Sequence, residues 1–125
     1  SGCAPLVAAH ERGDGSVEPW ESPDTIVGEL EITEPKGGAA ALEAIEETDG
    51  GTVAVDDEES LESAVLAAQQ VGVEVGTAGG VALAAVDQLA DDGRLGSDDH
   101  VAVVNTESGT KTADVLRSHL MGKGV

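Results

Sequence analysis

The side chains best suited to metal binding or nucleophilic attack are few and widely spaced. His10, His100 and His119 lack the HxxxH-type spacing of a metal site, and the single cysteine, Cys3, lies near only the first of them. A zinc site needs three or four nitrogen or sulfur ligands, so no metal site is predicted. The pattern favours His10 and His119 on helix surfaces, His100 at the start of a strand, and Cys3 as a small packed residue.

Adjacent acids occur at positions 56–57, 58–59, 91–92 and 98–99. Paired carboxylates can perform general acid–base chemistry, as they do in glycosidases. In a chain with 25 Asp and Glu residues, however, such pairs carry little specific information. Helix capping and solvation explain them, and no catalytic residue is assigned to them.

Two glycine-containing loops are candidates for anion binding. Residues 109–112 (GTKT) resemble the end of a P-loop, but that motif needs glycine directly before the lysine, where this chain has Thr110. Residues 76–80 (GTAGG) place small residues and free backbone N–H groups at a helix start, where an anion or cofactor can approach. A tight strand-to-helix turn is the simpler interpretation of that segment.

The elements that would position these residues alternate along the chain. Apolar periodicity and capping signals predict helices over residues 3–12, 39–48, 81–92 and 113–121, and another that starts at the capping-box pair Asp56 and Glu59. Short Val-rich or alternating segments predict strands over residues 25–32, 52–55, 71–75 and 100–104.

This alternation predicts one α/β domain over residues 1–125, with a small, mostly parallel sheet flanked by helices. So few short strands leave at least one sheet edge bare. We therefore expect the chain to be part of a larger α/β domain rather than a self-sufficient fold. Its start at Ser1 instead of Met agrees with this expectation.

The charge is unusual for a chain that is 40% hydrophobic: the formal net charge is -19. The surface carboxylates repel one another, and molar salt screens this repulsion by shortening the Debye length to roughly 3 Å. The charge therefore predicts a salt-loving source, with binding to a basic protein as the alternative. With six Lys and Arg, nucleic-acid binding is not expected. No membrane span or signal peptide is recognised, and one cysteine suits a reducing cytoplasm.

The order of several motifs is more specific than any one of them. Residues 2–7 (GCAPLV), 24–27 (DTIV) and 55–62 (VDDEESLE) resemble the GCAPI, TIA and VSDEEILEA segments of the C-terminal half of threonine synthase. Residues 72–79 (GVEVGTAG) lie where that family has GIFVEPAS, and residues 101–109 (VAVVNTESG) resemble its VVCVLTGHG segment. The resemblance covers nearly the whole chain.

The resemblance implies part of a fold-type-II pyridoxal-phosphate enzyme, whose family reaction converts O-phospho-homoserine and water to threonine and phosphate. In such enzymes a hydroxyl residue of the LTG segment hydrogen-bonds the pyridine nitrogen of the cofactor, and by motif position that residue is Thr106. A neutral hydroxyl partner leaves the ring nitrogen largely unprotonated. The implied partner of this chain is the remainder of the enzyme, and a homo-oligomer stays open.

The chain also departs from the family pattern. None of Lys36, Lys111 and Lys123 lies in a motif like that of the catalytic lysine, and the loop that binds the cofactor phosphate is absent. Gly76 replaces the acid of the VEP turn, and Glu107 replaces the first glycine of LTGHG. The chain alone is therefore expected to be inactive. Two alternatives stay open. The chain is a non-catalytic binding or regulatory module derived from this fold, or it is part of a related dehydratase or lyase.

Overall fold

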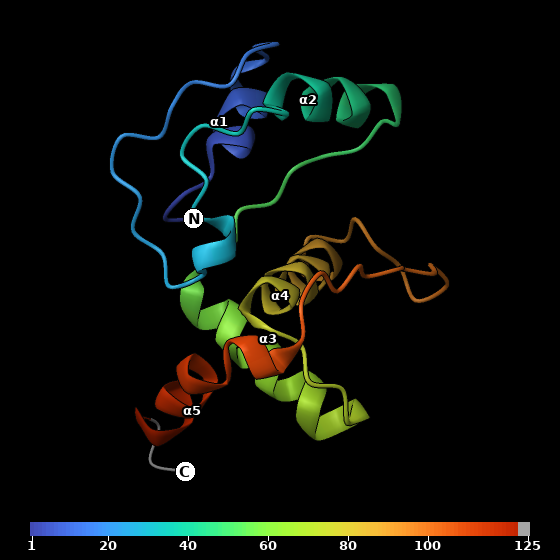
Figure 1. Ribbon diagram of the computed structural model, residues 1–125. Coiled ribbons are helices and arrows are strands. Elements are labelled where there is room, and N and C mark those ends of the chain that lie inside the picture. The colour runs from blue at the N-terminus through green and yellow to red at the C-terminus, as the bar shows by residue number, and fades with distance from the viewer. Residues whose placement is uncertain (123–125) are drawn as a thin grey trace. The chain divides into compact units, whose positions relative to one another are not determined.

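The computed structural model describes residues 1–122, and its regular elements are helices (Figure 1). Within these residues the elements are α1 (Pro5–Arg12), η1 (Gly28–Leu30), α2 (Gly38–Glu47), α3 (Asp57–Val71), α4 (Thr77–Asp91), η2 (Gly109–Lys111) and α5 (Ala113–Gly122), where η marks a 3-10 turn. No strand or sheet forms among the described residues, and an isolated antiparallel bridge joins Val75 to Ser108. The prediction of an α/β fold with a small, mostly parallel sheet is therefore wrong.

The predicted strands fail because a strand needs a neighbour to satisfy its backbone N–H and C=O groups. The segment over residues 25–32 contains the turn η1, and residues 71–75 begin with the last residue of α3. Residues 52–55 and 100–104 form no ladder with any other described segment, and Val101 and Val104 are 48% and 75% exposed. The β-forming composition is present, but the described residues provide no partner strand.

The helices agree much better with the sequence. Three of them, α1, α2 and α5, begin and end within about two residues of the predicted bounds. Helix α3 begins where its capping signal predicts, and the capping box of Asp56 and Glu59 is present there. The difference lies at α4, which begins at Thr77 instead of near residue 81. The segment predicted as a glycine-rich turn therefore forms the first turn of this helix.

The chain divides into two compact units, one over Ser1–Ala54 and one that starts at Val55. In the first unit, α1 ends at Gly13, whose φ of 69° is a left-handed conformation that suits glycine. Helix α1 packs against α2, and the buried apolar residues of the unit include Ala9, Val27 and Leu42. The assignment of residues 1–125 to one domain stays a prediction.

The second unit is built on the close packing of α3 against α4. A Cβ atom on Gly80 would collide with the carbonyl oxygen of Ser60, so glycine is what allows the two backbones to approach. The hydroxyl of Ser60 donates a 2.8 Å hydrogen bond to the carbonyl of Thr77, inside the interface. Leu61, Ala64 and Ala84 are buried around this contact. No helix within residues 1–122 has the length and apolar character needed to cross a bilayer.

Candidate functional site

The first turn of α4 is the most enclosed segment of the second unit, since every residue from 75 to 80 is buried. The first N–H groups of a helix have no partner within the helix and need one from elsewhere. Here the N–H of Thr77 donates to the hydroxyl of Thr112 at 3.2 Å, and the N–H of Ala78 donates to Oε1 of Glu107 at 3.1 Å. These two N–H groups already have side-chain acceptors, which favours the structural interpretation of residues 76–80 over an anion site.

The partners of this helix start come from the loop over residues 105–112. The loop is fixed next to residues 74–75 by the bridge between Val75 and Ser108 and by a 3.3 Å hydrogen bond from the N–H of Gly109 to the carbonyl of Glu74. Ser108 caps the turn η2 by accepting from the N–H of Thr110. The two glycine-containing loops that the sequence presents separately therefore meet in the folded unit.

Glu107 is the central side chain of this contact, and only 3% of it is exposed. Its Oε1 accepts from Ala78. Its Oε2 is buried without a hydrogen-bond partner among the described residues and lies 3.9 Å from Nζ of the exposed Lys111. A carboxylate at a helix N-terminus is stabilised by the helix dipole. In the sequence, Glu107 stands out only as a departure from a family motif, because a single acid among 25 gives no signal of burial.

Thr106, the predicted partner of the cofactor ring, directly precedes Glu107 and is exposed. The loop therefore anchors one residue in the core while its neighbour in the sequence faces outward. No contact among the described residues tests the predicted role of Thr106, which stays a prediction.

The other residues considered from the sequence do not converge on a site. Cys3 is half-buried, His10 is exposed on α1, His100 is exposed, and His119 is half-buried on α5. Over residues 1–122, no group of three or more His, Cys, Asp or Glu side chains is arranged to hold a metal ion.

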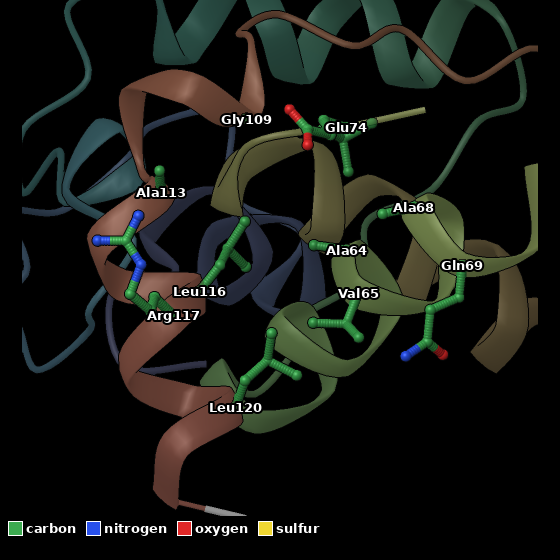
Figure 2. Close-up of a pocket in the computed structure, with 11 residues that line it drawn as sticks. Ala64, Val65, Ala68, Gln69, Glu74, Gly109, Ala113, Leu116, Arg117 and Leu120 are labelled. Carbon is green, nitrogen blue, oxygen red and sulfur yellow. The ribbon is translucent and has the colours of Figure 1, made fainter. Parts of the chain in front are cut away.

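A cavity of about 400 Å³ lies between α3 and α5 (Figure 2). Leu116 and Leu120 of α5 and Val65 of α3 give it an apolar wall, and Glu74 and Gly109 also line it. Neither Thr106 nor Glu107 lines this cavity, so it is distinct from the contact at the start of α4.

Comparisons with known proteins agree with the motif order. The sequence profile of the family described as pyridoxal-phosphate dependent enzyme matches residues 1–107. Among similar curated proteins, the threonine synthase of Methanocaldococcus jannaschii is 30% identical over 113 residues, which is 90% of this chain and 28% of that protein. The threonine synthase of Methanosarcina acetivorans is 32% identical over 105 residues, 84% of this chain and 26% of that protein.

The threonine synthase of Mycobacterium tuberculosis is 32% identical over 114 residues, 91% of this chain and 29% of that protein. The chain thus spans little more than a quarter of the length of these relatives. Because the family profile covers most of its length, the chain belongs to the pyridoxal-phosphate dependent enzyme family.

Proposed function

We propose that this chain is the C-terminal part of a threonine synthase-like enzyme, which converts O-phospho-homoserine and water to threonine and phosphate. The observation that carries this proposal is the similarity to threonine synthases from three separate genera over 84–91% of the chain. In this proposal the chain supplies one side of the cofactor site, and the rest of the enzyme supplies the other.

The residues of the second unit fit the ring end of the cofactor. Bound pyridoxal phosphate supplies an electron sink for the substrate. The exposed hydroxyl of Thr106 has the chemistry to donate a hydrogen bond to a pyridine nitrogen, and the buried Glu107 next to it limits how far that hydroxyl can move. As a neutral donor, Thr106 leaves the ring nitrogen largely unprotonated, which suits elimination and replacement reactions.

The phosphate end of the cofactor does not fit the start of α4. The N–H groups of Thr77 and Ala78 already donate to Thr112 and Glu107, and a phosphate there would meet the buried carboxylate of Glu107. We therefore propose that the rest of the enzyme binds the phosphate, as the missing phosphate-binding motif also predicts.

No lysine of the described residues has the surroundings of a catalytic amine. Lys36 is exposed in the first unit, and Lys111 is 63% exposed beside the carboxylate of Glu107. Lys123, the other lysine considered from the sequence, lies outside the described residues. In this proposal the catalytic lysine comes from the rest of the enzyme, and this chain alone is inactive.

Exposed apolar residues in each unit support the proposal that another part of the enzyme covers them, on the same chain or on a separate one. Val101, Val103 and Val104 are exposed just before Thr106 in the second unit. Ile26, Leu30 and Ile32 are exposed in the first unit. These residues have the composition of strands without partner strands, so the remainder of the enzyme is the partner that we propose for them.

The test is a pyridoxal-phosphate titration of the 125-residue chain at molar KCl, followed by borohydride reduction and peptide mapping. The proposal expects no stoichiometric binding and no single labelled lysine. Mixing the chain with the N-terminal portion of a threonine synthase should restore cofactor binding and phosphate release from O-phospho-homoserine. Stoichiometric labelling of one lysine in the chain alone would overturn the proposal, because the chain would then have a cofactor site of its own.

A further inference from the structure

The residues at positions 76 and 107 occupy the same small volume at the start of α4. A Cβ atom built on Gly76 would collide with Oε1 of Glu107 and would lie 2.5 Å from Cδ and 2.6 Å from Cγ of the same side chain. No side chain fits at position 76 while Glu107 is in place. The backbone of Gly76 has φ -78° and ψ -178°, which any residue can adopt, so the demand for glycine comes from this contact alone.

The contact reverses the arrangement of the threonine synthase motifs quoted above. Those motifs have an acid at the position of Gly76, in the VEP turn, and a glycine at the position of Glu107, in the LTGHG segment. This chain has the glycine and the acid exchanged, and the two positions touch. In this chain the acid at position 107 therefore requires the glycine at position 76.

We infer that Glu107 is a positioning residue: its buried carboxylate, supplied from the loop over residues 105–112, holds that loop against the start of α4. Its Oε1 accepts from the N–H of Ala78 at the positive end of the α4 dipole. The same bond holds the backbone next to Thr106. One part of the inference rests on the proposed function, namely that the residue positioned by Glu107 is Thr106.

The burial of Glu107 supports a specific role over general solvation. A buried carboxylate oxygen without a hydrogen-bond partner is unfavourable, and Oε2 of Glu107 is such an atom. Lys111, at 3.9 Å, is mostly exposed and offsets little of that cost. An exposed acid would serve solubility without this penalty.

The test is a double-mutant cycle on the 125-residue chain at molar KCl, with stability measured by denaturant unfolding. Gly76→Ala should lower the folding equilibrium constant by about tenfold or more, because its Cβ displaces Glu107. In a Glu107→Ala background the same change should cost less than about threefold. Gly96→Ala is the matched control, because its Cβ meets only an ordinary contact of 3.6 Å. Equal losses in both backgrounds would overturn the inference.

The reciprocal exchange tests the reversal itself. The double variant Gly76→Glu with Glu107→Gly returns the acid to the position of the family pattern, and it should be more stable than either single variant by about fivefold or more. A double variant no more stable than the worse single variant would contradict the exchange.

Amide hydrogen exchange keeps the inference testable even where a variant at position 76 does not fold. Glu107→Gln retains an acceptor oxygen and should keep the amide of Ala78 protected, whereas Glu107→Ala should lose about tenfold of that protection and loosen the backbone at Thr106. Glu74→Gln removes an exposed charge from the same region and should change neither amide. Full protection of Ala78 in Glu107→Ala would refute the assignment. None of these measurements needs the cofactor, so their outcome is independent of the proposed function.

Discussion

At the start of α4, a carboxylate from 29 residues further along the chain satisfies a backbone N–H group that has no partner within the helix. Glu107 is nearly fully buried for this purpose, and its neighbour Thr106 is exposed. Because Glu107 is anchored in the core, the backbone next to it is fixed, and the exposed hydroxyl of Thr106 is held in a defined place. Under the proposed function, this arrangement is how the chain would present Thr106 to the cofactor.

The role that we propose for Thr106 gives a prediction at this scale. In the enzyme assembled with its N-terminal part, Thr106→Val should remove the hydrogen bond to the ring nitrogen, lower cofactor affinity by about fivefold to tenfold and shift the cofactor absorbance. Cys3→Ala is the control and should leave both unchanged. Equal effects of the two substitutions, measured by absorbance titration with pyridoxal phosphate, would remove the assignment of Thr106.

At the scale of the elements, helix α3 organises the second unit from its first turn. Oε2 of Glu59 accepts from the backbone N–H of Asp56 at 3.1 Å and from Nε2 of Gln88 on α4 at 2.9 Å. One side chain thus closes the capping box and links the two helices. The Ser60 contact with Gly80 continues this interface toward the candidate site.

The capping box predicts a measurable loss of stability. Glu59→Ala removes both hydrogen bonds and should destabilise the chain by about 1–2 kcal/mol in denaturant unfolding. Asp87→Ala removes an exposed acid from α4 and serves as the control, with an expected change within about 0.5 kcal/mol. A loss for Glu59→Ala no larger than that of the control would show that the box is not formed.

The close approach of α3 and α4 predicts a larger effect. Gly80→Ala places a Cβ against the carbonyl of Ser60 and forces the two backbones apart, so it should cost about 2–3 kcal/mol although alanine is the better helix former. Thermal unfolding should show a much smaller change for Gly96→Ala, which lies outside the helices. A neutral or stabilising Gly80→Ala would mean that the helices do not pack as closely as described.

At the scale of the whole molecule, the charge of -19 opposes folding, and the core offers little to resist it. The buried apolar residues are Ala, Val and Leu, and the sequence contains neither Phe nor Tyr. Ion pairs such as those of Arg12 with Asp14 and of Arg117 with Asp114 are exposed and contribute little. Salt is therefore needed to screen the repulsion between the carboxylates. We propose that the protein comes from a salt-loving organism.

The corresponding prediction concerns folding in salt. The free energy of unfolding should rise by several kcal/mol between dilute buffer and molar KCl, because the Debye length falls to roughly 3 Å. Circular dichroism during thermal unfolding at increasing KCl concentrations measures this change. A cooperative transition of equal stability at both extremes would contradict salt adaptation.

The sequence by itself determined the helices, the charge and the family. Helix signals act within one or two turns, so the spacing from Asp56 to Glu59 and the glycine at position 13 fix α3 and the end of α1 without knowledge of the fold. The motif order gave the relationship to threonine synthases for the same reason, since it is read along the chain.

Only the tertiary structure decided which segments meet. A Val-rich segment becomes a strand only beside another strand, and residues 101–104 have no partner strand within residues 1–122 despite their composition. In the same way, nothing near Glu107 in the sequence indicates that its carboxylate lies against Gly76 and Ala78. Both outcomes depend on contacts between residues distant in the sequence, which local propensity does not encode.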